Sequence, residues 1–336
     1  MGVLFLKGGL FTTVQDMGRN GYQKSGFHVS GVMDKRSFMI ANLLVDNPEN
    51  EAVLEFTMIG PTLKFTSDTI ISITGGDFCP KINGKEAPMY TAIYVHKDDV
   101  LEFQYAREGN WGYVAFSSRL DIPMMMGSRS TDTKCRIGGY HGRKMEKGDH
   151  IWFRAKRRYL SSFLSRSIPR EHFEEQLVKI RVVMGPQDDY FAAEGIQTFL
   201  EEEFMVTSDC DRMGYRLDGP YIAHNDRGAD IISDGIALGS VQVPSNGRPI
   251  VMLSDRQTTG GYTKIATIIS VDIPKLVQCK EQTKIRFEKI SVAKAQQLYL
   301  KELDEYDVIR RKIHHPCREV LDPRQSAKRI AALFKD

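Results

Sequence analysis

Apolar and polar positions alternate with period two along most of the first half of the chain, as in half-buried antiparallel strands. Turn residues such as Gly75–Gly76 and Asp98–Asp99 separate some of these runs. Further β-branched runs follow after residue 245 and are typical of strands. The pattern predicts a mainly β protein, with strands that include residues 69–74, 91–95, 100–103, 111–116, 249–253 and 265–269.

Helical periodicity is confined to a few segments. Asp34 suits the N-cap of a helix that runs to about Val45 with its apolar residues on one face. Pro186 suits the first turn of a second helix, which is expected to reach Leu200. Apolar residues recur at helical spacing from Ser291 to about residue 313, and a last short helix is expected after residues 322–323.

The chain length of 336 residues exceeds what one ordinary hydrophobic core supports and predicts two domains. The boundary is expected in the polar, charged stretch at residues 165–178, ahead of the apolar run 180–183. We therefore predict an N-terminal β domain at residues 1–170, a second β domain at residues 171–290 and a helical tail at residues 291–336.

Two weak repeats suggest that the halves are related. Residues 97–103, 147–153 and 281–287 each place a polar turn before a strand whose last inward position is aromatic. The spacing Asp-x-x-Arg-x-Gly-Tyr occurs at residues 16–22 and again at residues 209–215. Two related β-rich halves would account for both repeats.

Composition is that of an ordinary globular protein, with 41% hydrophobic and 26% charged residues. The net charge is only +3, so no overall field favours nucleic acid. No signal peptide and no apolar run of membrane-spanning length is visible, so we expect a cytoplasmic protein without a membrane segment. A local basic cluster is interpreted as a solvated connector and comprises Arg154, Lys156, Arg157, Arg158, Arg166 and Arg170.

The cysteines and histidines give no sign of a metal site or a disulfide framework. Five scattered cysteines form no CxxC pair, which predicts reduced thiols. The histidines lack metal-ligand spacing, so each is interpreted as structural or exposed. No P-loop, HExxH, EF-hand or GxSxG motif occurs, so any ATP must bind by another geometry.

Residues 257–264 carry the densest chemistry in the sequence. Between two predicted strands they place an amide, three hydroxyls, two glycines, a phenol and an amine. Glycines let the backbone approach a ligand closely, and the polar groups can then orient it. A plain turn needs far less chemistry, so we predict that this segment is the wall of a small-molecule site.

Residues 12–22 are the corresponding candidate in the first half. The side chains of Gln15 and Arg19, with neighbouring hydroxyls, could grip a carboxylate or phosphate, for which arginine is the natural fork. A capped turn in which Asp16 merely pairs with Arg19 explains the same residues equally well. If both segments bind a ligand, they are expected to meet across a domain interface, where pockets are common.

Four aspartates are candidates for holding magnesium, and each has a simpler explanation. Asp34 is expected to be only a helix N-cap. Asp77 follows two glycines, which either present backbone N–H groups to a ligand or form a tight turn. Asp188 and Asp189 lie in the first turn of a predicted helix, where they complement the helix dipole. The sequence assigns the metal to none of them.

Five long runs carry a resemblance to a known family. They are GLFTTVQDMGRNGYQ, SGVMDKRSFMIANLLVDNPENEAVLEFTMIGPTLKF, VVMGPQDDYF, SDCDRMGYRLDGP and SDGIALGSVQVPSNGRPIVMLSDRQTTGGYTKIATIISVDIPKL. In family order, they extend over most of residues 8–290 and resemble the allophanate hydrolase subunit 2 family. That family includes KipA-type antagonists and the C subunit of bacterial 5-oxoprolinase.

The resemblance implies a fold of two cyclophilin-like β-barrel subdomains. It also implies a KipI-like partner, the B subunit, in equal numbers, and a separate A subunit of 5-oxoprolinase. Together these subunits open the lactam 5-oxoproline to glutamate at the expense of ATP, and the B–C pair resembles the carboxyltransferase region of urea carboxylase. The chain has no Met-Lys-Met tripeptide, so no covalently attached biotin is expected.

In that setting ATP, expected with magnesium, would phosphorylate the lactam carbonyl oxygen so that water can attack the resulting imidate. Lys264, Arg19 and Arg212 are the expected catalytic cations. The residues expected to bind substrate are Gln15, Tyr22, Gln257, Thr258, Thr259 and Tyr262. Two alternatives stay open: a KipA-type regulatory protein that binds a KipI-like histidine-kinase inhibitor, and a biotin-dependent carboxyltransferase component.

Overall fold

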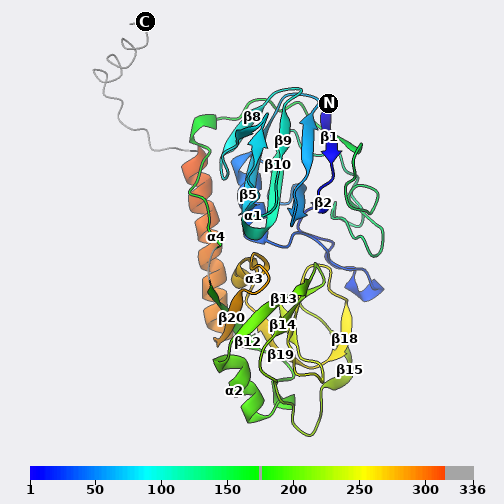
Figure 1. Cartoon of the computed structure of the whole chain (residues 1–336), viewed down its shortest axis with the longest axis vertical. Coiled ribbons are helices and arrows are strands. Elements are labelled where there is room, and N and C mark those ends of the chain that lie inside the picture. Colours follow the sequence, from blue (N-terminus) through cyan, green and yellow to red (C-terminus); the bar gives the residue numbers. More distant parts are fainter. Residues whose placement is uncertain (174–175, 315–336) are drawn as a thin grey trace, which may run out of the picture.

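The computed structural model describes residues 1–173 and 176–314. In its first half two sheets share one hydrophobic core, to which β1, β4 and β9 contribute from one sheet and β3, β5 and β10 from the other. We call this unit the N-terminal sandwich (Figure 1). Its strand orders are β11-β1-β4-β9-β6-β7 and β2-β3-β10-β5-β8.

The strands of the sandwich are short, and all of them end before residue 153. Their bounds are Gly2–Lys7 (β1), Phe11–Gln15 (β2), Val53–Thr57 (β3), Thr62–Phe65 (β4), Thr69–Asp77 (β5), Lys81–Ile82 (β6), Lys85–Glu86 (β7), Ala92–Val95 (β8), Val100–Glu102 (β9), Glu108–Phe116 (β10) and His150–Trp152 (β11).

The second half contains a closed barrel of seven strands in the order β12-β19-β16-β17-β14-β13-β20. A two-stranded ribbon of β15 and β18 accompanies it. The bounds are Leu177–Met184 (β12), Phe204–Cys210 (β13), Gly214–Asp218 (β14), Asp230–Gly235 (β15), Ser240–Gln242 (β16), Ile250–Met252 (β17), Thr259–Tyr262 (β18), Lys264–Ile268 (β19) and Lys284–Lys289 (β20). The predicted mainly β class is confirmed.

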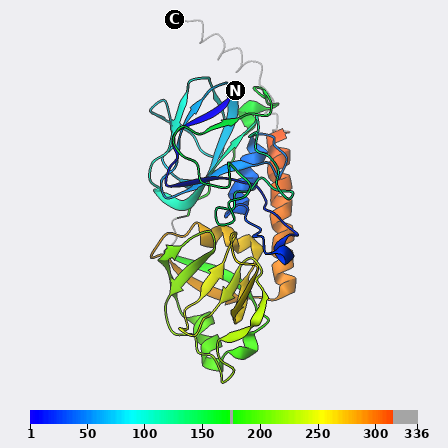
Figure 2. The same ribbon diagram turned by 90° about the vertical axis from the view of Figure 1, so that its right-hand side faces the viewer.

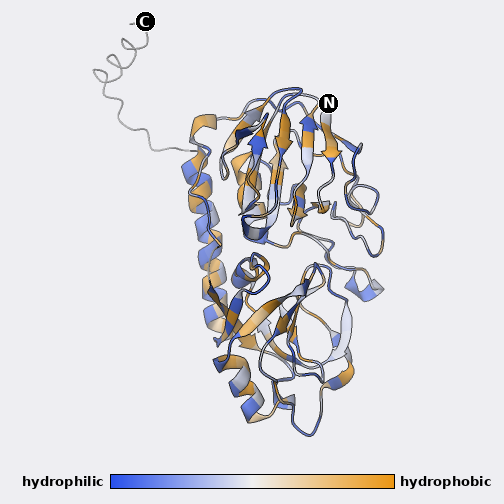
Figure 3. Cartoon of the chain, in the orientation of Figure 1, coloured by the Kyte–Doolittle hydropathy of each residue, from blue (hydrophilic) through white to orange (hydrophobic). Residues whose placement is uncertain are grey.

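Helices cover the outside of this β framework. α1 packs on β5 and β10, and α4 contacts both α1 and the segments η2 and η4, so it lies alongside both halves (Figure 2). Polar and apolar residues alternate along α4, as in a helix that covers a surface with one face (Figure 3). The helix bounds are Lys35–Leu44 (α1), Ala193–Glu201 (α2), Ile273–Val277 (α3) and Val292–His314 (α4), with 3₁₀ turns at Gln23–Ser25 (η1), Phe163–Ser165 (η2), Asp188–Tyr190 (η3) and Ser270–Asp272 (η4).

Two barrels were expected from the resemblance, and this expectation is wrong for the first half. Among the described residues, the hydrogen-bonded strand order ends at β11 and β7 in one sheet and at β2 and β8 in the other. The sandwich therefore stays open at its edges, and only the second half closes.

The helix predictions hold with one correction. The backbone N–H of Ser37 donates to Asp34 Oδ1 at 2.9 Å, so Asp34 caps α1 as predicted. The second helix begins at Ala193 rather than in the first turn after Pro186, because residues 188–190 form a separate 3₁₀ turn and Phe191 is extended. The last predicted helix, after residue 322, lies outside the described residues.

The longer sequence repeat has a structural counterpart. Asp98, Gly148 and Gln282 occupy the same position in the three repeats, and their φ angles are +72°, +94° and +70°. Each residue lies in the turn that leads into β9, β11 or β20. The repeat therefore records one turn geometry used in both halves of the molecule.

The basic cluster is less solvated than expected. Arg166 is fully buried, and its Nη1 donates to the carbonyls of Leu43 and Leu44 at 3.3 and 3.2 Å. These are the last residues of α1, where unpaired carbonyls and the helix dipole favour a cation. Arg166 therefore fixes the end of α1.

Candidate functional site

A cavity of about 500 Å³ lies between the sandwich and the barrel. The sandwich contributes Thr57, Tyr105, Asn110 and Trp111 to its walls, and the barrel contributes Thr207, Asp211, Arg212 and Asp255. Of the residues predicted to bind or catalyse, Arg212 is the one that lines this cavity.

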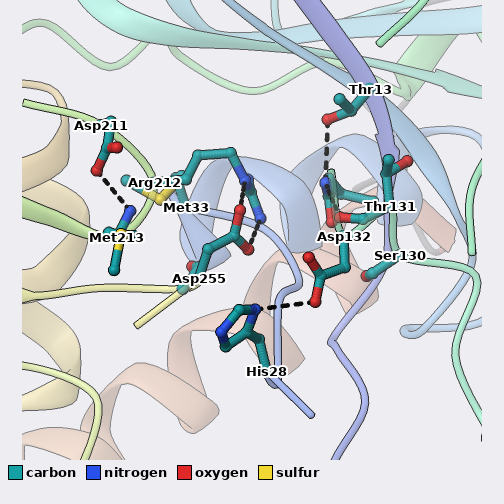
Figure 4. Close-up of polar contacts among 12 residues, drawn as sticks. Thr13, His28, Met33, Ser130, Thr131, Asp132, Asp211, Arg212, Met213 and Asp255 are labelled. Carbon is teal, nitrogen blue, oxygen red and sulfur yellow. Dashed lines mark hydrogen bonds and ion pairs between the residues drawn. The ribbon is translucent and has the colours of Figure 1, made fainter. Parts of the chain in front are cut away.

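Arg212 joins the two halves rather than pointing at open space (Figure 4). Its Nε and Nη2 bind the carboxylate of Asp255 at 2.9 and 3.0 Å, and Nη2 also donates to Gly31 O at 2.6 Å. Nη1 pairs with Glu55 of β3. Burial lowers the pKa of Arg212, but Asp255 and Glu55 outweigh burial and raise that pKa above its usual value. All three guanidinium nitrogens are therefore engaged.

Two further side chains of the barrel half complete this junction. Gln278 Oε1 accepts from the backbone N–H groups of Asn110 and Trp111 at 2.8 and 3.0 Å, and its Nε2 donates to Asp34 at 2.7 Å. The hydroxyl of Tyr215 accepts from the side chains of Asn110 and Trp111 at 2.8 and 3.0 Å. We call Arg212, Tyr215 and Gln278 the junction residues.

Lys264 lies at the start of β19 and is only 2% exposed. Its Nζ forms an ion pair with Asp234 Oδ2 at 3.3 Å, yet it has no well-formed hydrogen bond to any described residue. Asp234 itself is more than half exposed, so this pair leaves the amine with free donor capacity. A buried ammonium with spare donors is unusual in a purely structural role.

Gln242 lies beside Lys264 on the neighbouring strand, because the two residues are paired in the β16–β19 register. Its side chain is buried, and Nε2 has no hydrogen-bond partner among the described residues. A Cβ on Gly260 would lie 2.9 Å from that nitrogen and 2.7 Å from Ile236 Cδ1. Glycine at position 260 therefore leaves room beside the Gln242 amide.

Arg256 is a second buried cation of this region, at 9% exposure. Its Nε and Nη1 donate to the carbonyls of Ile236 and Leu253 at 2.9 and 3.2 Å. Burial lowers its pKa, and no carboxylate pairs with it in the described part of the chain. We call Gln242, Arg256 and Lys264 the barrel corner.

The predicted 257–264 segment is a ribbon rather than a loop. Thr259–Tyr262 form β18, which pairs with β15, because residues 230–235 supply a partner strand. Gln257 and Thr258 are half-buried, whereas Thr259 and Tyr262 are exposed. Their predicted role in substrate binding stays a prediction.

In the segment after β2, the contacts of Asp16 differ from the simpler explanation of a capped turn in which Asp16 pairs with Arg19. Asp16 does not pair with Arg19. Its carboxylate accepts from the hydroxyls of Ser128 and Ser130 at 2.6 Å and from the N–H groups of Gly18 and Arg129 at 2.9 and 2.6 Å. The carboxylate of Asp16 therefore organises the loop around residue 129, and Arg19 is left for other partners.

Gln15 and Arg19 both keep a buried, unpaired group. Arg19 Nη2 donates to Ser130 O at 2.8 Å, but Nη1 has no partner among the described residues. Gln15 Nε2 donates to Thr13 and to Thr131 O at 3.0 and 3.1 Å, while its Oε1 is unpaired. We call Gln15 and Arg19 the sandwich corner; the hydroxyl-bearing Tyr22 nearby in sequence is 39% exposed.

Arg19 and Lys264 share no side-chain partner in the described residues, and neither lines the cavity between the halves. Each corner thus offers spare polar groups within its own half. The sequence predicts that the two segments meet across a domain interface. Among the described residues, the structure records no shared contact that would join them around such a crevice.

The aspartates named as magnesium candidates are largely occupied. Both oxygens of Asp34 accept hydrogen bonds, from Ser37 and Gln278. Asp77 accepts from the N–H of Cys79 at 2.8 Å and pairs with Arg170 at 3.2 Å. Burial acts to raise the pKa of Asp77, but these donors hold it below its usual value. Neither carboxylate suits Mg²⁺ without giving up these partners.

The remaining two aspartates lie at the barrel surface. Asp188 and Asp189 belong to the short turn η3, and Asp189 pairs with the exposed Arg227. They do not occupy the first turn of α2, so they cannot complement its dipole as predicted.

One cluster was missed entirely by reasoning from the sequence. His28 Nδ1 lies 3.0 Å from Asp132 Oδ2 (Figure 4) and 3.9 Å from Cys135 Sγ. Burial and the neighbouring Asp132 raise the pKa of Cys135 above its usual value. His28 and Asp132 are 104 positions apart, which no spacing motif could connect.

Residues 25–289 match the carboxyltransferase domain family in its subdomains A and B. The chain belongs to this family. One relative, the C subunit of 5-oxoprolinase from Escherichia coli K12, is 33% identical over 312 residues, covering 89% of this chain and 96% of the relative. The corresponding C subunit of Haemophilus influenzae 5-oxoprolinase is 32% identical over 299 residues, with 89% and 94% covered.

The carboxyltransferase fold is also seen in a larger enzyme. The crystal structure of the K. lactis urea amidolyase matches with a TM-score of 0.84 at 27% identity. The match covers 92% of this chain but 20% of that enzyme, so the chain corresponds to about a fifth of it. The family resemblance inferred from the sequence is confirmed.

None of the helices in the described residues is long and apolar enough to cross a membrane.

Proposed function

We propose that the chain is the C subunit of an ATP-dependent 5-oxoprolinase, which opens 5-oxoproline to glutamate together with a KipI-like B subunit and a separate A subunit. The observation that carries this proposal is the nearly end-to-end alignment with a known C subunit of 5-oxoprolinase, 89% of this chain against 96% of the relative. As part of the proposal, the B and C subunits assemble in equal numbers and the closed barrel is of the cyclophilin-like class.

The barrel corner supports this function chemically. 5-Oxoproline carries a carboxylate and an amide carbonyl, and both are hydrogen-bond acceptors. Lys264 and Gln242 offer buried donors without a hydrogen-bond partner among the described residues, and Arg256 adds a positive charge without a paired carboxylate there. Donors fixed in a water-poor site stabilise developing negative charge far more than donors in water. We infer that Lys264 and Gln242 orient the lactam carbonyl and that Arg256 favours binding of the anion.

ATP, when bound by the assembled enzyme, supplies the phosphoryl group that turns the lactam carbonyl oxygen into a leaving group. The spare donors of Arg19 and Lys264 fit an anionic group of this kind. The carboxylates of Asp34 and Asp77 do not fit Mg²⁺, because arginines and hydrogen-bond donors already occupy them, so no step is assigned to a metal in this chain.

The test uses the chain co-expressed with its partner subunits. Lys264→Ala should reduce ATP-dependent glutamate formation from 5-oxoproline by about 10²-fold or more, as loss of one charge-stabilising donor does. Lys284→Ala, at an exposed lysine of β20 paired with Glu203, is the matched control and should keep full activity. Unchanged turnover in Lys264→Ala, with the complex intact, would refute the barrel corner as the site.

A second candidate is a carboxyltransferase component, favoured by the TM-score of 0.84 with urea amidolyase. It predicts that carboxybiotin is consumed without ATP hydrolysis by this assembly. A stable complex that turns over neither 5-oxoproline nor carboxybiotin would instead favour the KipA-type regulatory function.

A further inference from the structure

A group of three different metal-ligating side chains lies outside the corners and the junction. The ligand atoms of His28, Asp132 and Cys135 all lie within 4.8 Å of one another. His28 Nδ1 is 3.0 Å from Asp132 Oδ2 and 3.9 Å from Cys135 Sγ. A nitrogen, an oxygen and a sulfur atom thus converge on one small volume.

The carboxylate of this cluster is held in place by the backbone. The N–H groups of Lys134 and Cys135 donate to Asp132 Oδ1 at 3.0 and 2.9 Å. This leaves Oδ2 directed at His28, and the carboxylate side chain is fully buried. Hydrogen bonds that fix the first ligand in this way are the usual outer support of a metal site.

A catalytic relay does not explain the arrangement. In a cysteine–histidine–aspartate relay the thiol and the carboxylate contact opposite ring nitrogens. Here both groups face the same nitrogen, His28 Nδ1. A metal ion that binds these three side chains would displace the protons that they carry.

The spacing suits a tetrahedral ion. Metal–ligand bonds of about 2.0–2.3 Å at tetrahedral angles separate neighbouring ligand atoms by about 3.3–3.7 Å. The separations of His28 Nδ1 from Asp132 Oδ2 and from Cys135 Sγ, 3.0 and 3.9 Å, bracket that range, and all three ligand atoms lie within 4.8 Å of one another. We propose that His28, Asp132 and Cys135 bind one Zn²⁺ ion, with a fourth position open to water or to another ligand.

The choice of metal follows from the donors. Mg²⁺ and Ca²⁺ take oxygen ligands almost throughout, whereas Zn²⁺ accepts imidazole, carboxylate and thiolate together. Cys135 is exposed, so an ion can reach the buried carboxylate from the solvent side. Three protein ligands and an open position distinguish this site from a closed structural zinc site.

The location connects the ion to the cavity between the halves. Thr133 and Lys134, which stand between Asp132 and Cys135, line that cavity. His28 belongs to the segment that follows β2 and η1. A bound ion would therefore fix this segment to the loop at residues 132–135, beside the cavity wall.

The test measures metal binding by the purified full chain. Under reducing conditions it should bind one equivalent of Zn²⁺, measured by elemental analysis after removal of excess metal. Substituted Co²⁺ should give the near-ultraviolet charge-transfer band that requires a thiolate ligand. Cys135→Ser should abolish the band and weaken Zn²⁺ affinity by about 10²-fold or more, because loss of a ligand costs at least as much as loss of the outer support of a ligand.

Cys79→Ser is the matched control, because it makes the same chemical change at a half-buried thiol outside the cluster, and it should leave both readings unchanged. His28→Gln should weaken Zn²⁺ binding as Cys135→Ser does. Agreement between the two variants would show that the loss comes from removing a ligand and not from a local effect of the cysteine substitution. Absence of stoichiometric binding, or a Co²⁺ band that persists in Cys135→Ser, would overturn the proposal.

Discussion

The junction residues and the barrel corner are both buried and polar, but they differ in how fully their hydrogen bonds are used. Arg212 and Gln278 have every donor nitrogen engaged, with contacts that reach Gly31, Asp34 and Glu55 in the other half. Lys264 and Gln242 leave donors without a hydrogen-bond partner among the described residues. Burying an unpaired polar group costs free energy, and such groups are rare in folded proteins. The difference separates residues whose hydrogen bonds hold the two halves together from residues that, under the proposed function, have donors free for a ligand.

This contrast changes the interpretation of Arg212. In the setting implied by the family resemblance, Arg19, Arg212 and Lys264 are the expected cations around a transferred phosphoryl group. In the structure Arg212 pairs with both Glu55 and Asp255, whereas Arg19 and Lys264 have no such saturated network among the described residues. A positive charge in a pocket wall is therefore weak evidence for catalysis until its partners are counted.

The largest effect on stability is expected at the junction. Arg212→Met would leave the carboxylates of Glu55 and Asp255 buried without their cation, at a cost of about 3–5 kcal/mol in the free energy of unfolding. Urea denaturation followed by fluorescence measures this loss. Arg216→Met, at an exposed position of the neighbouring strand β14, is the control and should stay within about 0.5 kcal/mol. A loss below about 1 kcal/mol for Arg212→Met would show that the junction residues do not stabilise the fold more than the barrel corner does.

An intermediate effect is expected at Gln278. Gln278→Ala should cost about 1–3 kcal/mol, because the N–H groups of Asn110 and Trp111 lose their shared acceptor. Gln278→Glu keeps that acceptor but sets a carboxylate against Asp34, so the pKa of the new carboxyl should be raised. Its destabilisation should then grow as the pH rises through that pKa and shrink at lower pH. A pH-independent loss in the urea series would contradict this account.

The smallest effect on stability is expected at the barrel corner. Lys264→Met makes the same kind of change as Arg212→Met, yet the carboxylate that loses its partner, Asp234, is already more than half exposed. The free energy of unfolding should change by less than about 1 kcal/mol, in either direction. Gln242→Leu should behave alike. Loss of several kcal/mol in either variant would show that the corner supports the fold after all.

Local features of the fold could be predicted from the sequence. α1 and α4 follow from helical periodicity over many residues, and the Asp34 cap follows from one side chain near its own helix. The turn shared by the three repeats is likewise local, since Asp98, Gly148 and Gln282 each adopt it within a few residues of a strand.

Features set by distant pairing could not be predicted. The position of Gln242 beside Lys264 depends on the β16–β19 register, and β18 depends on a partner strand that lies well before it in the chain. Closure of the second half but not the first also follows from which edge strands meet. The cluster of His28, Asp132 and Cys135 joins segments that only tertiary folding brings together.

Helix α4 sets a limit on how this molecule can move. Its 23 residues form a rod about 34 Å long, attached to α1 near the sandwich and to η4 near the barrel. Arg36 binds it through Glu305 at 3.1 Å. Hinge bending of one half against the other would have to detach this rod at one end. The β15–β18 ribbon lies on the side of the barrel away from α4 (Figure 1), so a displacement of this ribbon would leave the helix in place.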